Sequence, residues 1–332
     1  MYHICLIPGD GIGREVIPAS RRLLEETGLP LAFTPAEAGW ATFERLGVSV
    51  PEETLDAIRA CDATLAGAFT SPIRKVEGHF GAIRYMRREL DLFANLRPAK
   101  SRPVPGSFKG VDMLMVRENT QGLYVAQERR YGDVAIADAV VTRSASERIA
   151  RVALEQAMMR RRKVTIIHKA NVLPLTTGLF LETAREVAKE FPAVTTEGVI
   201  VDAAAMKMVR DPGSFDVMVT TNLFGDILSD LMAGLVGGLG LAPSANLGSD
   251  HAIFEPVHGS APDIAGKGVA NPAAAMLTAA MLLTYLGEQQ VAGRMEKAVE
   301  YVLSRGPLTP DLGGNATTTT FTDAVIEAYR RG

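Results

Sequence analysis

The chain has 332 residues, and its 47% hydrophobic content is enough to bury a large core and predicts two lobes. Its formal charge of -3 argues against a general nucleic-acid binder. The two cysteines, Cys5 and Cys61, have no metal-ligand spacing, so we expect both to be reduced and structural in a cytoplasmic protein.

No segment of the sequence predicts contact with a membrane. The N-terminus reaches an apolar strand at once and has no signal-peptide pattern. The longest apolar stretch, residues 273–287, is shorter than a membrane span. We expect it to form a buried helix or a subunit interface.

The first glycine-rich turn, CLIPGDGIGREVIPAS (5–20), follows an apolar strand and precedes a helical pattern. The dinucleotide-binding fingerprint requires glycine at its first, third and sixth positions. Gly9 and Gly11 fit, but Arg14 occupies the sixth position and Gly13 comes one residue early. This turn therefore does not predict an ordinary Rossmann domain.

Apolar strand-like runs alternate with helical patterns, which favours an α/β fold. The expected strands are 63–69, 111–117, 163–169, 198–205 and 216–222, and the expected helices are 13–27, 52–60, 83–93, 145–160, 176–191 and 226–235. Glycine- and proline-rich segments at 101–110 and 234–248 predict connections between lobes. The first lobe then comprises 1–98 plus 255–332, and the second 99–254.

Several arginines follow one another between residues 84 and 117. Arginine binds carboxylates and phosphates through a bidentate fork, so arginines that converge indicate a small polyanion. The alternative is a salt-bridged helix surface, with Glu89 and Asp91 as partners. The arginines are Arg84, Arg87, Arg88, Arg97 and Arg117.

Tyr124 and Lys169 lie where strand-like runs give way to loops, and Asn171 follows Lys169. Sites in α/β proteins are built at such positions. A lysine beside carboxylates can accept a proton and a tyrosine can donate one. A structural or exposed role is the alternative for each residue alone.

In the segment GDILSDL, Asp226 and Asp230 are four residues apart and share one helix face. Two carboxylates on one face suit Mg²⁺ or Mn²⁺, which prefer oxygen ligands. The alternative is a solvated helix start whose acidic residues complement the helix dipole.

The segment EPVHGSAPDIAGKGVANP (255–272) is a second loop rich in glycine and proline. It offers backbone donors together with the side chains of His258, Ser260 and Asp263. Asn271 and Pro272 predict the N-cap and the first position of the helix that ends near Gly287.

Taken in order, the motifs GDGIG, RRELDLFANLRP, RENTQGLY, HKAN, NLFGDILSDL and HGSAPDIAGKGVANP resemble the metal-dependent β-decarboxylating dehydrogenases. This family acts on isocitrate, isopropylmalate or homoisocitrate. The resemblance covers nearly the whole chain and implies a two-lobed α/β fold that is not a Rossmann domain. It places the cofactor along the 255–272 loop in the first lobe, and the metal-binding aspartates and the dimer interface in the second.

The resemblance also implies roles for individual residues. Tyr124 and Lys169 would be catalytic, as proton donor and acceptor. Lys169, Asn171 and Asp202 would act in the site of a second subunit, so that the protein is at least a homodimer with shared sites. The metal ligands would be Asp202, Asp226 and Asp230, and the substrate ligands Ser71, Arg84, Arg87, Arg97, Arg117 and Asn171.

The implied cofactor is NAD, bound by residues of the second glycine-rich loop. Family members that use NADP have Lys and Tyr where this chain has Asp263 and Ile264. The alternative is that Asp263 caps a turn. The cofactor ligands implied are Glu255, His258, Gly259, Ser260, Ala261, Asp263, Ile264 and Asn271.

The segment SPIRKVEGHFGAIRYMRR (71–88) would bind the γ-arm of the substrate, the part that carries either a third carboxylate or an isopropyl group. Arg84 suits a third carboxylate and opposes an isopropyl group. With residues 131–140, this segment most resembles homoisocitrate dehydrogenases of lysine synthesis through aminoadipate, and isocitrate, one methylene shorter, would also be accepted. Isocitrate and 3-isopropylmalate dehydrogenase remain the alternatives.

The chain departs from the family pattern at two places. Gln121 stands where relatives usually have Glu, and Ala203 and Ala204 follow Asp202 where relatives often have larger or polar residues. Neither departure lies at a candidate metal ligand or at a candidate proton donor or acceptor, so these departures bear on fine specificity more than on activity.

Two other classes of protein are alternatives to the enzyme. A regulatory subunit of a heteromeric dehydrogenase should have lost part of the set Tyr124, Lys169, Asp226 and Asp230, and all four remain. A magnesium-dependent phosphoryl-transfer protein would need a phosphate-binding P-loop, which the sequence lacks.

Overall fold

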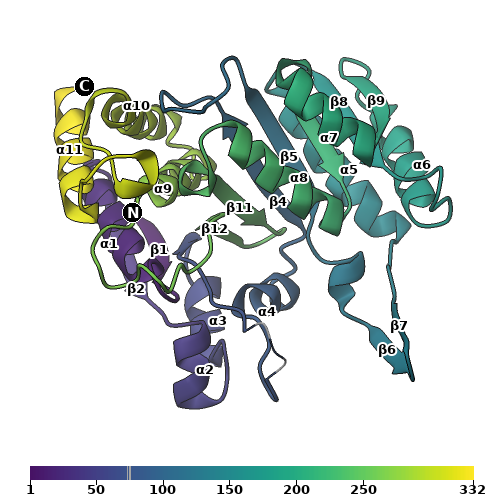
Figure 1. The fold of residues 1–332 in the computed structure, drawn as a ribbon, viewed down its shortest axis with the longest axis horizontal. Helices are drawn as coiled ribbons and strands as arrows, with labels where there is room; N and C mark the ends of the chain where they lie inside the picture. The colour runs from purple at the N-terminus through teal and green to yellow at the C-terminus, as the bar shows by residue number, and fades with distance from the viewer. Residues whose placement is uncertain (73, 75) are drawn as a thin grey trace. The chain divides into compact units, whose positions relative to one another are not determined.

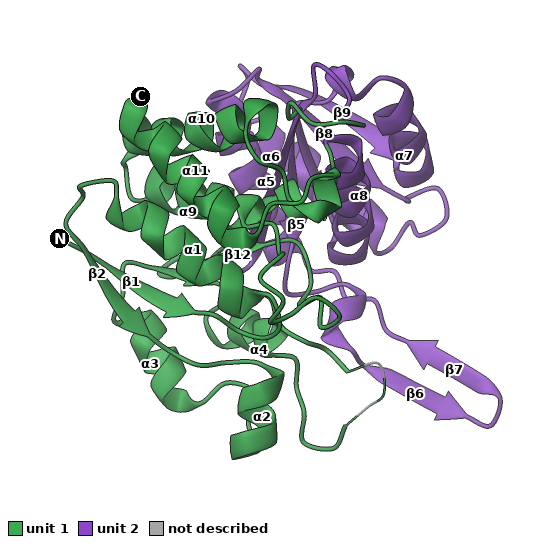
Figure 2. Cartoon of the chain, turned by 60° about the vertical axis from the view of Figure 1, so that its left-hand side comes forward, with its two compact units in different colours: residues 1–91, 102–107, 237–332 green, residues 92–101, 108–236 purple. Residues whose placement is uncertain are grey.

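The computed structural model describes residues 1–72, 74 and 76–332, and it confirms the predicted α/β architecture (Figure 1). Two compact units make up the chain (Figure 2). Unit 1 contains Met1–Asp91, Arg102–Ser107 and Gly237–Gly332, and unit 2 contains Leu92–Ser101 and Phe108–Val236. The chain passes between the units inside 101–110 and near the start of 234–248.

Among its described residues, unit 1 has five strands in the spatial order β2-β1-β3-β12-β11. They are β1 (Tyr2–Ile7), β2 (Leu31–Pro35), β3 (Ala63–Ala66), β11 (Pro243–Leu247) and β12 (Ala252–Pro256). Neighbours pair in parallel, except that β11 is antiparallel to β12. The last four residues of β1 are buried, because a parallel strand covered on both faces needs a continuous apolar run.

The helices of unit 1 are α1 (Gly13–Glu25), α2 (Trp40–Leu46), α3 (Glu52–Arg59), α4 (Ala82–Glu89), α9 (Ala273–Tyr285), α10 (Gln289–Arg305) and α11 (Thr318–Arg331). Its 3-10 turns are η3 (Leu239–Leu241) and η4 (Pro310–Leu312). The apolar stretch predicted to be a buried helix forms α9, which packs against α1, α10, β11 and β12. Among the described residues, no helix is both long and apolar enough to cross a membrane.

Unit 2 has the strand order β4-β5-β10-β8-β9. The strands are β4 (Ala94–Lys100), β5 (Asp112–Glu118), β8 (Lys163–His168), β9 (Thr195–Ile200) and β10 (Val217–Thr220). β4 is antiparallel to β5, and the other pairs are parallel. A separate hairpin of β6 (Glu128–Tyr131) and β7 (Val134–Ala137) extends from this unit, and all of its strand residues are exposed (Figure 2).

The helices of unit 2 are α5 (Arg143–Met158), α6 (Thr177–Ala188), α7 (Val201–Arg210) and α8 (Asn222–Leu235), and its 3-10 turns are η1 (Leu123–Val125) and η2 (Pro212–Ser214). A core rich in methionine lies between the sheet and the helices α7 and α8, with Met113, Met115, Met218 and Met232 all fully buried. Methionine fills irregular gaps between helices and sheet because its side chain is unbranched and flexible.

The strand expected at 198–205 is wrong in its second half. β9 ends at Ile200, and Val201 begins α7. The run Ala203–Ala205 has high helix propensity, and Asp202 in the first turn complements the helix dipole. The apolar pattern of these residues therefore belongs to a helix.

Candidate functional site

In unit 2, the side chain of Asp226 is the centre of a polar cluster. It lies on α8 and accepts hydrogen bonds from Arg117 Nη1 at 2.6 Å, from Arg97 Nη1 at 3.3 Å and from the hydroxyl of Tyr124. The structure thus brings together one predicted metal ligand, two predicted substrate arginines and the predicted proton donor. These residues come from β4, β5, η1 and α8.

Arg97 bridges the two aspartates of α8. Its Nη1 atom lies 3.3 Å from Asp226 Oδ1, 3.3 Å from Asp230 Oδ1 and 2.8 Å from Ser229 Oγ. One guanidinium reaches all three because positions i, i+3 and i+4 share a face of the helix. The predicted common face of Asp226 and Asp230 is therefore present.

The electrostatics of this face fit a divalent cation. Burial raises the pKa of Asp230, and the carboxylate of Asp226 raises it further, while Arg97 opposes the rise. A partly buried carboxylate whose charged form is disfavoured gains from a nearby cation, and carboxylate oxygens are the ligands that Mg²⁺ and Mn²⁺ prefer. Asp226 and Asp230 fit the implied metal.

Tyr124 is held in a form that can donate a proton. Burial raises the pKa of its hydroxyl, and the hydrogen bond to Asp226 raises it further. The Arg117 guanidinium lies 5.0 Å from the centre of the Tyr124 ring. Arg117 therefore fixes both the tyrosine and the aspartate that accepts its hydrogen bond.

Arg117 is itself fixed on all sides. It is the penultimate residue of β5, pairs with Asn95 of β4 and Thr220 of β10, and is only 1% exposed. Its Nε and Nη2 atoms donate to the backbone and side chain of Asn222 at 2.9 and 2.7 Å. A guanidinium held by this many acceptors keeps one orientation.

Neither Asn222 nor Ser229 was predicted from the sequence. Asn222 lies four residues before Asp226 and Ser229 three residues after it, so all share the face of Asp230. Their helical spacing from Asp226 and Asp230 is the sequence feature that could have identified them. Asn222 is fully buried, and its Nδ2 atom has no hydrogen-bond partner among the described residues.

The loop that carries Tyr124 is tied down by Glu118 and Gln121. The Glu118 carboxylate accepts hydrogen bonds from the backbone of Thr120 and Gln121, each at 2.8 Å. The Gln121 amide accepts from Thr142 N at 2.9 Å and donates to Thr142 Oγ1 at 2.9 Å. The neutral side chain at this departure from the family pattern therefore anchors the loop to the N-cap of α5.

Lys169 and Asp202 form a second group in unit 2. The Lys169 ammonium is paired with the Asp202 carboxylate at the start of α7, and this hydrogen bond lowers the pKa of Asp202. Asn171 is exposed in the turn after Lys169. Within the described residues, no three His, Cys, Asp or Glu side chains are grouped to hold a metal, so Asp202 does not join Asp226 and Asp230 in one chain.

In unit 1, the predicted arginines have two different environments. Arg87 is buried, and donates to Asn246 Oδ1 at 2.9 Å and to Glu255 Oε1 at 3.0 Å. Arg84 is half-buried, with its guanidinium 4.7 Å from the centre of the Phe80 ring. Ser71 is exposed, and of the γ-arm segment Ile73 and Lys75 lie outside the described residues.

The loop at 255–272 offers groups that suit a nucleotide. Burial lowers the pKa of His258, and its Nε2 atom is buried with no described hydrogen-bond partner. Nδ1 lies 3.0 Å from the Gly259 carbonyl and donates to it, which leaves Nε2 as an acceptor in the neutral ring. Gly259 is exposed, and Ala261 has a positive φ of 39° at the turn that carries Asp263 and Ile264.

Asp263 is exposed, and its carboxylate accepts no hydrogen bond from any residue that the structure describes. The turn from Ala261 to Ala265 is closed by backbone hydrogen bonds instead. No described contact therefore supports the alternative role of Asp263 as a turn cap. Its carboxylate is available to a ligand.

Asn271 caps α9, although one position away from the expected place. Its Oδ1 atom accepts a hydrogen bond from Ala273 N at 3.0 Å, and its Nδ2 atom donates to Asp311 at 3.0 Å. The helix begins at Ala273, so Pro272 occupies the N-cap position instead of the first turn.

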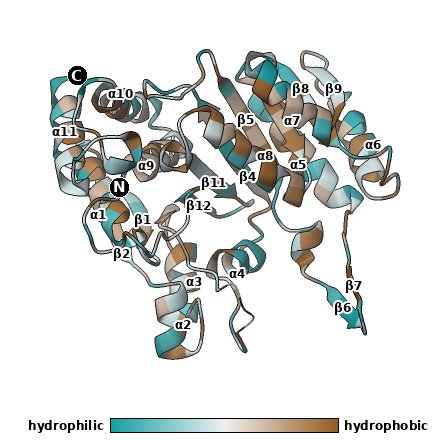
Figure 3. Cartoon of the chain, viewed as in Figure 1, coloured by the Kyte–Doolittle hydropathy of each residue, from teal (hydrophilic) through white to brown (hydrophobic). Residues whose placement is uncertain are grey.

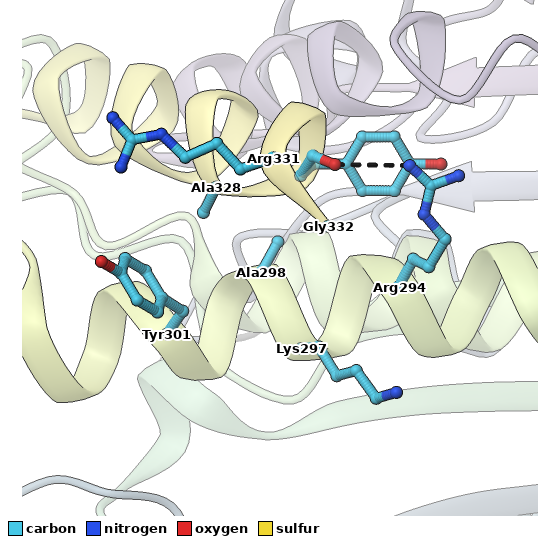
Figure 4. A pocket seen from close by; sticks show the side chains of 8 residues that line it. Arg294, Lys297, Ala298, Tyr301, Ala328, Arg331 and Gly332 are labelled. Atoms are coloured by element: carbon cyan, nitrogen blue, oxygen red, sulfur yellow. Dashed lines mark hydrogen bonds between the residues drawn. The ribbon is translucent and has the colours of Figure 1, made fainter.

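Two cavities in unit 1 lie apart from the predicted ligand residues. One, of about 330 Å³, lies between α10 and α11 and is lined by Arg294, Lys297, Tyr301 and Tyr329 (Figure 4). The other, of about 380 Å³, lies beside Gly9, Arg14 and Glu37. Neither includes a predicted site residue.

Comparison with known proteins gives one consistent result. Residues 3–325 match the isocitrate/isopropylmalate dehydrogenase family. The chain is 70% identical over 330 residues to an isocitrate/homoisocitrate dehydrogenase of Thermus thermophilus, covering 99% of each chain. It is 51% identical over 327 residues to a 3-isopropylmalate dehydrogenase of Archaeoglobus fulgidus, covering 98% of each.

A solved structure agrees with these relatives. The isocitrate dehydrogenase of Methylococcus capsulatus superposes with a TM-score of 0.94 at 46% identity, covering 99% of this chain and 100% of its own. The fold and the family resemblance expected from the sequence motifs are confirmed.

Proposed function

Because the chain belongs to the isocitrate/isopropylmalate dehydrogenase family, a family of decarboxylating dehydrogenases, we propose that it converts homoisocitrate to 2-oxoadipate and CO2 with NAD⁺. Isocitrate is a second substrate in this proposal. The reaction would serve lysine synthesis through aminoadipate.

The cluster around Asp226 is the observation that carries the proposal. A protonated tyrosine, two arginines and a pair of carboxylates meet within one unit. Loss of a β-carboxylate requires groups that bind the substrate carboxylates and a positive charge beside the oxygen of C2. It also requires a proton donor for the carbon that loses CO2. The residues of this cluster supply each of these needs.

Asp226 and Asp230, with Asp202, would hold Mg²⁺ or Mn²⁺. The cation would supply Lewis acidity for the C2 oxygen of the substrate, and NAD⁺ would supply a hydride acceptor. Lys169 Nζ, as the neutral amine, would take the proton of the C2 hydroxyl. The Tyr124 hydroxyl then gives its proton to the carbon that has lost CO2.

The arginines bind and orient the substrate carboxylates. Arg97 and Arg117 are held by Asn95 and Asn222, and Arg87 is held by Asn246, so little freedom is lost when they bind a carboxylate. Asn171 and Ser71 would add hydrogen bonds. Guanidinium forks of this kind favour an acid with several carboxylates.

We also propose a homodimer, or a higher homo-oligomer, with shared sites. Asp202 is not grouped with Asp226 and Asp230 among the described residues of one chain, so a site with three aspartates needs a second copy. The copy would also bring Lys169 and Asn171. Hydrophobic residues on α7 and α8, coloured brown in Figure 3, are exposed to an extent that suits burial by a partner: Met206 is 50%, Val209 47% and Ile227 60% exposed.

The preference for homoisocitrate rests on the γ-arm segment, and that for NAD⁺ on Asp263. Arg84 offers a half-exposed cation for a third carboxylate, which an isopropyl group cannot use. Asp263 can accept a hydrogen bond from a ribose 2′-hydroxyl and would repel a 2′-phosphate. His258, Ser260 and Asn271 would contact the rest of the cofactor.

Absorbance at 340 nm, with purified protein and Mn²⁺, tests the proposal. We expect the highest kcat/KM with homoisocitrate and NAD⁺, lower values with isocitrate and much lower values with 3-isopropylmalate. Highest activity with 3-isopropylmalate would refute the substrate. No activity with any of the three, regained on adding a related subunit, would support a regulatory subunit instead.

A further inference from the structure

The turn GDGIG does not have the glycine pattern of a phosphate-binding Rossmann turn, and the structure shows a different use for it. The turn follows β1 and joins three other segments of unit 1. These segments are the first turn of α2, the loop after β3 and the predicted cofactor loop.

Asp10 makes two of these connections with one buried side chain. The side chain is 4% exposed, and its carboxylate accepts hydrogen bonds from Trp40 N at 2.7 Å, Ala41 N at 3.1 Å and Thr70 N at 2.9 Å. No cation pairs with it among the described residues. Three backbone N–H groups bind this carboxylate, so their positions depend on it.

The third connection runs to Ser260 of the cofactor loop. The Thr70 hydroxyl donates to Ser260 Oγ at 2.7 Å, and Ile12 N donates to the Ser260 carbonyl at 2.9 Å. A Cβ atom at Gly11 would lie 1.9 Å from that carbonyl oxygen, so only glycine permits the approach. Ser260 is buried at this junction.

Thr70 immediately precedes Ser71, the first residue of the predicted γ-arm segment. Ser260 precedes Asp263 by three residues in the predicted cofactor loop. The Asp10 carboxylate and the Thr70 hydroxyl thus connect two segments. One is the segment that would bind the γ-arm of the substrate, and the other is the loop that would hold the cofactor.

We propose that Asp10 is a positioning residue that fixes the substrate-reading loop and the cofactor loop through Thr70, so that loss of its charge weakens the binding of both ligands. The inference rests on the proposed function, because it assigns these two loops to substrate and NAD⁺. Asp10 does not contact the reacting atoms in this proposal. The residues proposed to transfer protons, Tyr124 and Lys169, belong to unit 2.

Asp10→Asn keeps the size of the side chain and removes its charge, and Thr70→Val removes only the hydroxyl that reaches Ser260. We expect Asp10→Asn to raise the KM of both ligands, and the Kd of NADH titrated without substrate, by about 5- to 30-fold. Thr70→Val should raise the same constants by less. In both variants kcat should stay within about twofold of wild type, because the proton-transfer groups are unchanged.

Hydrogen exchange provides a measurement that needs no ligand. We expect Asp10→Asn to lose protection at the amides of Trp40, Ala41 and Thr70 in the ligand-free protein. Ser20→Ala is the matched control, because Ser20 is fully buried in α1 and donates to Val16 O at 2.9 Å. This control should lower Tm without changing either KM.

Unchanged KM values in both Asp10→Asn and Thr70→Val, with an active wild type, would overturn the inference. A rise for only one ligand would overturn the joint role of the junction. If Asp10→Asn does not fold, the two KM values of Thr70→Val test the inference alone, by the same criteria. A wild type that neither turns over these substrates nor binds NADH would instead refute the proposed function, while the exchange measurement would still test the junction.

Discussion

Gly225 lies directly against the side chain of Arg117. A Cβ atom at Gly225 would lie 2.6 Å from Arg117 Cγ and 2.7 Å from its Cβ. The missing side chain of the glycine is what lets α8 approach β5 closely enough for Arg117 to reach Asp226 and Asn222.

Gly225→Ala should therefore damage both stability and catalysis. Arg117 is 1% exposed and has no open space to enter, so we expect a loss of about 1–3 kcal/mol from overpacking. Displacement of Arg117 should also lower kcat. Denaturant unfolding and the 340 nm assay measure the two effects.

Gly234→Ala in the same helix is the control. A Cβ atom at Gly234 would meet nothing within 4 Å, so we expect no loss of activity and a gain of about 0.5–1 kcal/mol from helix propensity. Equal effects of the two substitutions would show that packing on Arg117 is unimportant.

The second prediction concerns metal binding by Asp230. Its raised pKa means that the folded protein disfavours the charged form, so at neutral pH this carboxylate lowers stability when no metal is bound. The effect is small, since the side chain is 53% exposed. Asp230→Asn should leave the metal-free Tm unchanged or slightly higher.

Addition of Mn²⁺ should then distinguish wild type from Asp230→Asn by the change in Tm. Wild type should gain in Tm, because a ligand at 100 times its Kd adds about 2.7 kcal/mol of stability. Asp230→Asn should lose this gain. Asp250→Asn, at an exposed aspartate of unit 1, should keep it, and a gain that persists in Asp230→Asn would remove Asp230 from the metal site.

The third prediction concerns the γ-arm of the substrate. Arg84→Val removes one charge-assisted contact, so kcat/KM for homoisocitrate and isocitrate should fall by about 10-fold or more, while 3-isopropylmalate should improve. Arg88→Val is the matched control: Arg88 also contacts the Phe80 ring, but it is exposed and paired with Glu89. Equal losses in both variants would show that the loss comes from packing on Phe80.

The contrast between α8 and α7 shows what the sequence could predict. The spacing of Asp226 and Asp230 defines a shared face whatever the helix packs against, so this part of the site was predictable. The bridge from Arg97 was not, because it depends on how β4 and β5 pair. The start of α7 was not predictable in this way, because apolar periodicity alone does not distinguish a short buried strand from the first turn of a helix.

The role of the first glycine turn shows a similar limit. Its sequence excluded the ordinary fingerprint, but no local pattern of residues indicates that Gly11 packs on Ser260, about 250 residues away in the chain. Contacts between segments so distant in sequence follow from the tertiary fold. Local patterns cannot supply them.

The fourth prediction concerns shared sites. Tyr124→Phe and Lys169→Met should each be inactive, since one lacks the proton donor and the other the proton acceptor. When the two variants are refolded together, one site of each mixed dimer has both residues intact. We expect activity to return toward a quarter of wild type for random pairing into homodimers and heterodimers.

Mixing the variants without refolding is the control, and it should restore little activity if subunits exchange slowly. Mass spectrometry under native conditions measures the fraction of heterodimers. Heterodimers without recovered activity would place Lys169 in the site of its own subunit.

The last prediction concerns the choice of cofactor, and it rests on the exposed turn at Asp263 and Ile264. The Asp263 carboxylate accepts no hydrogen bond from the described part of the chain, so it can bind a ribose 2′-hydroxyl without breaking a contact. A 2′-phosphate would meet a like charge, which disfavours NADP⁺. Wild type should therefore have the higher kcat/KM with NAD⁺, and Asp263→Lys with Ile264→Tyr should shift the preference toward NADP⁺. Lys267→Tyr, in the same exposed loop, should leave the ratio unchanged, and a wild type that prefers NADP⁺ would contradict the assignment without any variant.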